Sequence, residues 1–538
     1  MRHLVLCVAL LSACKASDPK DPQTFVKKLS DSDPKTRQKA VQELRKLKAR
    51  EAAAPVAALL RDPLVKEDAA LALQEMGGPA EVPALLEAVD TTVGAGSDQA
   101  TRVANRTNAK IAEALGNIGD AKAGPTLLRL ARASDDLVRL SAVQALGQVK
   151  FADGVGELSH IVDDPAAPPI LIKKAIISLG QIGDARAIPA LEHGLVLERQ
   201  GVSFLPESSF ALFLLGKDAV EPLLKLAQDQ DPAWLAWAKE QNRAPAGTYA
   251  KAALVLGDLE DLRAVPALLK KLKYEDPDPV PGTSHLLSNL VREFSANALG
   301  RMRVKEAAGP IQQLVTVKDP VDEDVVSFAC EALVWIGDKA QARELLKKAA
   351  QPGALKLRLS AAQSAAQLGE PALVKDLSAI AAKESKGQGA ACQKQLAEAN
   401  LPADDPKTAC EALGAQFGQL AAAFEAAKAC NDNAACWTGR LATDKDPWVR
   451  ARAAYELGRA GAAEAVPPLL KAVSDGELAS RAAAIRALDW LAASPAAKEP
   501  LRQAAAQLMT QLNAETGRVQ FVRVNEDLRR LQVRLSRL

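Results

Sequence analysis

The chain has 538 residues, and its charge is nearly balanced, with 68 lysines and arginines against 66 aspartates and glutamates. This balance argues against a dedicated nucleic-acid-binding protein, which normally carries a strongly basic domain. Aromatic residues make up 4% of the sequence, too few for a platform on which bases stack. The abundant alanine suits closely packed helices.

The first residues have the pattern of a bacterial lipoprotein signal. Arg2 supplies a positive charge, Leu4 to Leu11 form an apolar run, and Leu11-Ser12-Ala13-Cys14 matches the lipobox. The run is too short to span a bilayer, which needs about 20 apolar residues. We therefore predict a signal peptide at residues 1–13 and a mature chain that begins at Cys14.

By its resemblance to lipoproteins, Cys14 is expected to carry several acyl chains, which anchor a protein stably where one chain is marginal. The alternative is an ordinary secretory signal in which Cys14 is incidental. Lys15 stands where an aspartate favours retention in the inner membrane, so we expect the outer membrane. Residues 14–23 are polar and contain proline, as in a tether.

One short pattern recurs along the rest of the chain. Its copies LGNIGDAKAGPTL, LGQIGDARAIPAL, LGDLEDLRAVPAL and LGRAGAAEAVPPL each place a proline nine residues after a glycine. We interpret the glycines as residues that end one helix in a left-handed conformation. The prolines are expected at the first position of the next helix, where a missing N–H costs nothing. The glycines are Gly116, Gly180, Gly257 and Gly458, and the prolines are Pro125, Pro189, Pro266 and Pro467.

These helix–turn–helix units return every 31 to 43 residues, the range of a two-helix solenoid repeat. They resemble HEAT repeats, particularly the short bacterial type also found in phycobilisome-linker lyases. The openings Asp135–Arg139 and Asp446–Arg450, of the form D-x-x-V-R, carry the likeness together with the Leu-Gly ends. The resemblance implies an all-α, right-handed α-solenoid of about twelve helix pairs, over residues 24–384 and 441–513. It also implies a binding surface, because HEAT arrays serve mainly to bind diverse partners.

A tryptophan-containing insertion, residues 231–249, interrupts one repeat. Trp234 and Trp237 can serve as anchors for a partner, because large aromatic side chains dominate binding hot spots. The alternative is that both rings pack onto the solenoid and fill a wide gap between repeats. The first interpretation makes this insertion a candidate site, and the second makes it part of the core.

Four cysteines lie where the repeat pattern breaks, in a segment (385–440) that we predict to be a divergent helical hairpin. They are Cys392, Cys410, Cys430 and Cys436. Export permits disulfides, and of the three possible pairings we favour Cys430 with Cys436 and Cys392 with Cys410. A zinc site is the rival, but it needs closely spaced ligand pairs that are missing here. We therefore predict disulfides and no metal.

Residues 514–538 form an amphipathic helix in which Phe521, Val524, Leu528, Leu531, Leu535 and Leu538 alternate at spacings of three and four. This apolar stripe must be covered. The helix either caps the open end of the solenoid or pairs with another chain as a coiled coil. We interpret the arginines of this segment as its solvated face.

No catalytic motif is apparent. The histidines of the mature chain, His160, His193 and His285, are scattered without paired spacing, and we predict neither enzyme activity nor a cofactor. Two functions remain open. The first is a lipid-anchored scaffold of the cell envelope that binds protein partners. The second follows the lyase resemblance, a helper that binds a prosthetic group and attaches it to a client protein.

Overall fold

The computed structural model describes residues 21–90, 96, 98–283, 285–315, 323–350, 355–369, 371–373, 375–379, 406–516 and 522–538. Helices make up almost all of the regular structure in these ranges. A small antiparallel hairpin pairs β1 (Glu198–Arg199) with β2 (Val202–Ser203). The expected all-α solenoid is thus confirmed, and it divides into two compact units, unit 1 (Met1–Ala211) and unit 2 (Leu212–Leu538).

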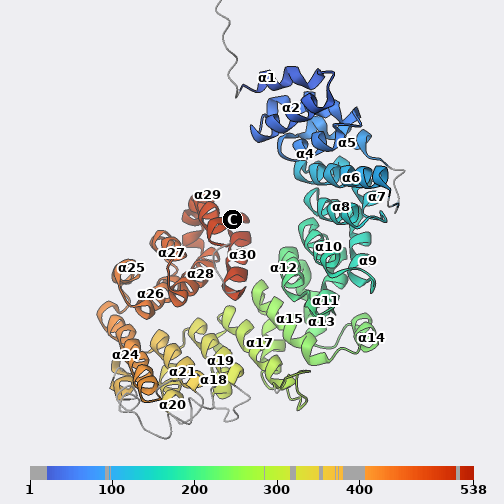
Figure 1. The fold of residues 1–538 in the computed structure, drawn as a ribbon. Coiled ribbons are helices and arrows are strands. Elements are labelled where there is room, and N and C mark those ends of the chain that lie inside the picture. Colours follow the sequence, from blue (N-terminus) through green and yellow to red (C-terminus); the bar gives the residue numbers. More distant parts are fainter. Residues whose placement is uncertain are drawn as a thin grey trace, which may run out of the picture. The chain divides into compact units, whose positions relative to one another are not determined.

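In unit 1, long helices alternate along the chain with short ones, and the two kinds lie on opposite sides of the stack (Figure 1). The long helices are α2 (Pro34–Lys46), α4 (Lys66–Met76), α6 (Gln99–Ile118), α8 (Asp136–Gln148), α10 (Pro169–Ile182) and α12 (Leu205–Leu215), the last of which continues into unit 2. The others are α1 (Pro22–Val26), α3 (Ala53–Ala58), α5 (Val82–Ala88), α7 (Gly124–Leu130), α9 (Val155–Asp163) and α11 (Ile188–Val196).

Unit 2 continues the same alternation. Its long helices are α15 (Pro245–Leu259), α17 (Leu287–Arg301), α19 (Glu323–Ile336), α21 (Leu355–Leu368), α24 (Pro406–Cys430), α26 (Pro447–Ala460) and α28 (Leu478–Ala492). The remaining helices are α13 (Val220–Ala227), α14 (Pro232–Glu240), α16 (Val265–Lys271), α18 (Ala308–Val315), α20 (Gln341–Ala350), α25 (Ala434–Thr443), α27 (Val466–Ala472), α29 (Pro495–Thr516) and α30 (Val522–Ser536). Figure 1 shows α30 beside α28, on the inner side of this unit.

The repeated prolines lie at the start of the short helices, close to the predicted position. Pro125, Pro189, Pro266 and Pro467 are each the second residue of α7, α11, α16 and α27. A 3-10 turn precedes each of these helices, namely Ala121–Ala123, Ala185–Ala187, Leu262–Ala264 and Ala463–Ala465. The regular helix therefore begins one residue before each proline, one position earlier than predicted.

The repeated glycines do not end the helices, so that prediction was wrong. Gly116 lies inside α6, which runs on to Ile118 and ends at Gly119 with a left-handed φ of 77°. A Cβ added at Gly116 would lie 2.8 Å from the Cβ of Ala145 on α8. The glycine is therefore a point of close approach between neighbouring long helices, and the left-handed residue follows three positions later. Gly180, Gly257 and Gly458 likewise lie inside α10, α15 and α26.

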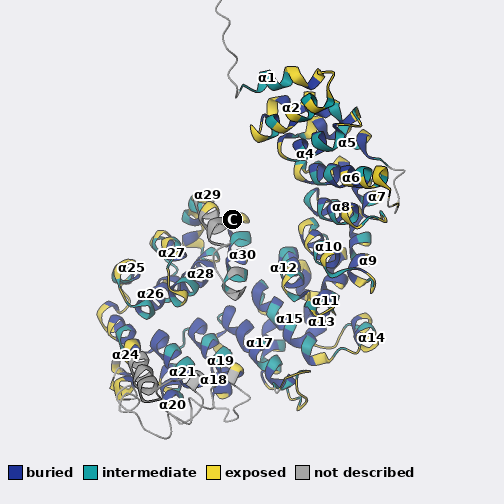
Figure 2. Cartoon of the chain, viewed as in Figure 1, coloured by how far each residue is buried: buried dark blue, intermediate teal, exposed yellow. Residues whose placement is uncertain are grey.

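A continuous apolar core runs between the long and the short helices, and alanine and leucine supply most of it. Figure 2 shows buried residues following the whole stack of unit 1 and the inner helices of unit 2. Among the described residues, no helix is both long and apolar enough to cross a bilayer. The predicted signal peptide and Cys14 lie outside the described residues, and α1 begins at Pro22, inside the predicted tether.

Candidate interaction surfaces

Polar side chains bridge neighbouring long helices of unit 1, on what we call the long-helix face (α2, α4, α6, α8 and α10). Between α4 and α6, the Gln74 amide donates to the Glu113 carboxylate at 2.7 Å, and the Asn117 amide donates to the Gln74 carbonyl at 3.2 Å. Between α6 and α8, Ser141 donates to Glu113 at 3.1 Å, and Gln148 donates to the Asn117 side chain at 3.3 Å. These bonds fix the spacing of successive repeats.

The residue directly after the repeated Leu-Gly is an amide in three consecutive repeats of unit 1: Asn117, Gln148 and Gln181. Asn117 and Gln181 are exposed, and Gln148 is half-buried. Two aliphatic side chains on α10, Ile170 and Ile177, are 55% and 41% exposed beside this row. A side-chain amide both donates and accepts hydrogen bonds. Because both polar atoms of the Asn117 amide already bond to neighbouring helices, the exposed amide that the long-helix face offers to another polypeptide is that of Gln181.

In unit 2 the same repeat position carries charges, and they are buried beneath α30. Asp258 follows Gly257 on α15, and Arg301 follows Gly300 on α17. Arg530 on α30 lies 2.8 Å from Asp258, and Asp527 on α30 lies 2.9 Å from Arg301. The side chains of Asp258, Arg301 and Arg530 are at most 5% exposed.

Helix α28 completes this buried network from the other side of α30. Arg486 lies 3.0 Å from Asp527, and Asp489 lies 2.9 Å from Arg534. Arg534 also lies 3.1 Å from Glu260, directly after α15. Burial alone would raise the pKa of Asp527, but Arg301, Arg486 and Arg530 outweigh burial and hold that pKa well below its usual value. The arginines thus compensate the charge of Asp527, whereas burial outweighs them at Glu260 and raises its pKa to about 8.

The apolar stripe of α30 is covered by neighbouring helices of unit 2. Leu528, Leu531 and Leu535 are buried in a core cluster shared with α26, α27, α28 and α29. The prediction that the arginines of this segment face solvent is wrong for Arg530, which is 5% exposed, although Arg529 is exposed. Sequence reasoning missed this site because the partners of α30 lie in distant repeats.

The two tryptophans of the insertion lie on α14, and their ring centroids are 5.1 Å apart. Trp234 is 5% exposed and Trp237 is half-buried. Trp234 therefore forms part of a wall, with little of its ring free to act as a protruding anchor.

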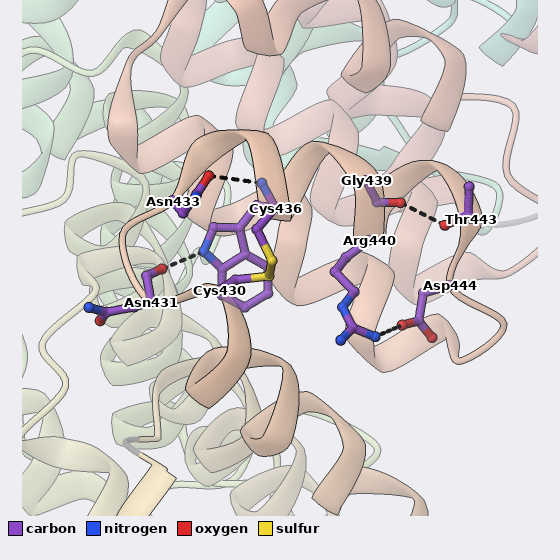
Figure 3. Close-up of a disulfide and its surroundings, with 9 residues drawn as sticks. Cys430, Asn431, Asn433, Cys436, Gly439, Arg440, Thr443 and Asp444 are labelled. Carbon is purple, nitrogen blue, oxygen red and sulfur yellow. Dashed lines mark hydrogen bonds and ion pairs between the residues drawn. A yellow bond between two sulfur atoms is a disulfide. The ribbon is translucent and has the colours of Figure 1, made fainter.

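The structure joins Cys430 and Cys436 in a disulfide between the end of α24 and the start of α25 (Figure 3). Two hydrogen bonds fix the turn: the Trp437 indole donates to the Asn431 carbonyl at 2.7 Å, and the Cys436 amide donates to the Asn433 side chain at 3.0 Å. The disulfide and these hydrogen bonds hold the end of α24 against the start of α25.

The other predicted pair is not described to the same extent. Cys392 lies outside the described residues, and Cys410 lies on α24 without a described side chain. Their pairing therefore stays a prediction. Cys330 on α19 is a free, buried thiol, and burial raises its pKa to about 12, which keeps it protonated and unreactive.

The histidines stay apart in the fold. Nδ1 of His193 lies 2.8 Å from Asp163, Nε2 of His285 lies 3.3 Å from Glu293, and His160 is exposed on α9. Within the described ranges, no three side chains of His, Cys, Asp or Glu come together as a metal site would require. Each histidine is accounted for by its own local environment.

Known families and proteins are similar to this chain over large parts of its length. The family of HEAT repeats matches residues 22–104, 98–171, 126–202 and 437–507, and the PBS lyase HEAT-like repeat matches residues 249–274. Deoxyhypusine hydroxylase-B of Oryza sativa subsp. japonica is 26% identical over 250 residues, which cover 38% of this chain and 78% of that protein.

Two solved structures are also similar to this chain. Importin beta is 12% identical with a TM-score of 0.44, over 93% of this chain and 70% of that one. The complex of CpcE and CpcF of phycocyanin lyase from Nostoc is 18% identical with a TM-score of 0.23, over 61% of this chain and 100% of that one. The family matches together span about half of the sequence. The stacked helix pairs of the structure agree with them. The chain is a HEAT-repeat protein with an all-α solenoid fold.

Proposed function

We propose that this protein is a non-catalytic, lipid-anchored scaffold of the bacterial cell envelope, and that it binds a protein partner on the long-helix face of unit 1. HEAT-repeat solenoids generally bind proteins, so the fold supports the general part of this proposal. The lipobox ending at Cys14 supports the anchor and the envelope location. Lys15 after that cysteine favours the outer membrane.

One contrast between the two units supports the choice of surface. The long helices of unit 2 place Asp258 and Arg301 beneath α30, which pairs with both charges. The corresponding row in unit 1 includes the exposed amides of Asn117 and Gln181. A face that combines an exposed amide with exposed aliphatic side chains, here Ile170 and Ile177 on α10, suits a polypeptide partner, because it offers both hydrogen bonds and apolar contact.

Site-specific photocrosslinking tests this proposal. A benzophenone amino acid replaces Gln148 or Gln181 on the long-helix face, and as a matched control it replaces His160, which is exposed on short helix α9. Irradiation of native envelopes should give the same discrete adduct at both long-helix positions and none at the control. Absence of an adduct at both positions, or the same adduct at His160, would refute the choice of surface.

The rival function is a helper that binds a prosthetic group and attaches it to a client protein. Its support is the match of residues 249–274 to the PBS lyase HEAT-like repeat. Titration of the purified mature protein with a tetrapyrrole separates the two. A shifted visible spectrum at a stoichiometry of one, followed by transfer to a client, would favour the helper over the scaffold.

A further inference from the structure

A cavity of about 270 Å³ lies between α14 and the beginning of α15. Its walls combine apolar groups with a few polar ones. The lining residues are Asp229, Trp234, Leu235, Ala238, Lys239, Asn242, Arg243, Pro245, Thr248 and Tyr249. Most of them belong to the insertion that the sequence singles out, and neither the scaffold function nor the α30 network uses them.

The positive end of α15 contributes to this cavity. Helix α15 has 15 residues and starts at Pro245, and its N-cap, Ala244, has no side chain that could accept a bond from the first turn. By contrast, α14 is capped by its own carboxylate, since Asp231 accepts from the Trp234 amide at 2.9 Å. Pro245 carries no N–H, and the Gly247 N–H donates to the Ala244 carbonyl at 3.2 Å. The attraction of this end of α15 for an anion therefore rests on the helix dipole.

A second observation points independently to a ligand. Thr248, in the first turn of α15, is 3% exposed, and its hydroxyl has no hydrogen-bond partner among the described residues. The Nε atom of Arg243 is buried and lacks a partner in the same described set. Leaving a buried polar group without a hydrogen-bond partner destabilises the folded state. Two such groups lining one cavity are what a polar ligand would satisfy.

The charges around the cavity favour an anion. Lys239 and Arg243 line it, and the one acidic lining residue, Asp229, already accepts a hydrogen bond from the Tyr249 hydroxyl. The Lys271 ammonium lies 3.0 Å from the centroid of the Tyr249 ring and adds a further positive charge nearby. The indole of Trp234 and the side chains of Leu235 and Ala238 supply the apolar wall.

We propose that this cavity binds a carboxylate carried on a small apolar group. The carboxylate would lie at the N-terminus of α15, within reach of the Thr248 hydroxyl and Arg243, and the apolar group would pack on Trp234. The volume suits one amino-acid residue and falls below the usual range for larger ligands, about 300–1,000 Å³. Such a group is found at the C-terminus of a polypeptide and in free small acids. The proposal goes beyond the scaffold function and does not depend on it.

Calorimetric titration of the full-length mature protein with N-acetyl-leucine tests the site, with N-acetyl-leucinamide as the matched neutral probe. The acid should bind at least tenfold more tightly than the amide. Arg243→Gln and Thr248→Val should each weaken acid binding about tenfold, whereas Thr248→Ser and Lys471→Gln, at an exposed position on α27, should leave it unchanged. Equal affinities for acid and amide in the unaltered protein, or no binding of either at millimolar concentration, would overturn the proposal without any variant.

A second pair of probes separates the two sources of the carboxylate. A heptapeptide ending in leucine with a free carboxylate is compared with its amidated form. Tighter binding of the free peptide than of N-acetyl-leucine would identify a polypeptide C-terminus as the ligand. Weaker binding of the peptide would identify a free small acid, and in both cases the preference for a carboxylate over an amide supports the site.

Discussion

The guanidinium of Arg530 on α30 lies 2.8 Å from the carboxylate of Asp258 on α15, and both side chains are almost completely buried. These residues belong to helices far apart in the sequence. Their ion pair therefore joins the C-terminal helix α30 to α15, near the beginning of unit 2.

Removal of one member of the network should destabilise unit 2 strongly. Arg530→Met removes one of the two guanidiniums that contact buried Asp258, the other being Arg301 at 3.1 Å. Breaking a buried pair in this way costs about 3–5 kcal/mol. Arg529→Met, on the exposed side of the same helix, is the matched control and should change stability by less than about 0.5 kcal/mol. Urea unfolding followed by circular dichroism measures both, and equal effects of the two variants would contradict the role of the network.

The stability of unit 2 should also depend on pH in acid. Because the surrounding arginines hold the pKa of Asp527 below its usual value, its charged form stabilises the folded state. This contribution is fully present above about pH 4, the unfolded pKa, and it is lost as the pH falls further. Asp527→Asn should be less stable at neutral pH and should lose less stability between pH 4 and pH 2.5. Thermal melts over this range test the sign.

Gly147 and Gly156 differ in how much room a side chain would have, so we expect alanine substitution to affect stability differently at the two positions. A Cβ added at Gly147 on α8 would lie 2.6 Å from the Cα of Ser178 on α10, whereas a Cβ at Gly156 on α9 would meet nothing within 4 Å. Gly147→Ala should therefore destabilise unit 1 by about 1–3 kcal/mol. Gly156→Ala should be neutral or stabilise by up to about 1 kcal/mol. Chemical denaturation that ranks the two in the opposite order would refute this assignment.

Reduction should loosen the divergent hairpin. The disulfide between Cys430 and Cys436 closes a short loop, and loop entropy predicts a loss of about 2 kcal/mol on reduction. The double variant Cys430→Ala, Cys436→Ala should have the same melting temperature as the unaltered protein in its reduced form. Added reductant should not change the melting temperature of this variant. Peptide mapping under non-reducing conditions gives an independent check, and it also tests the predicted link between Cys392 and Cys410.

Substitution of the predicted lipid-bearing residue tests the anchor. Cys14→Ser removes the thiol that lipid attachment requires, so the protein should move from the membrane to the soluble fraction. Cys330→Ser, at a buried thiol, should leave the distribution unchanged. A Cys14→Ser variant that remains with the membrane would show that the lipobox assignment is wrong.

The sequence predicted the architecture well because helix pairs depend on local signals. The prolines at Pro125 and Pro189 mark helix starts through their own backbone chemistry, wherever the helix packs. The Leu-Gly pairs were misread for a related reason. A glycine that ends a helix and a glycine that lets two helices touch look alike in the sequence, and only the neighbour, Ala145 for Gly116, distinguishes them.

The candidate surfaces were harder to predict, because they depend on contacts between distant repeats. The arginines of α30 alternate with a leucine stripe. This pattern indicates a solvated face unless the helices that pack against α30 carry charges of opposite sign. Asp258 and Asp489 provide those charges from separate repeats. The tryptophans, by contrast, were assigned to an irregular insertion, and the alternative that they pack inward agrees with Trp234, which is 5% exposed.

Helix α30 has a consequence for how the chain is made. Arg301 leaves the ribosome 226 residues before Asp527, its ion-pair partner. During synthesis, the charged residues that later pair with α30 must therefore stay hydrated until α30 itself has been translated. Folding steps that join residues so far apart in the sequence are slow. The ion pairs that close unit 2 can therefore form only after α30 has been synthesised.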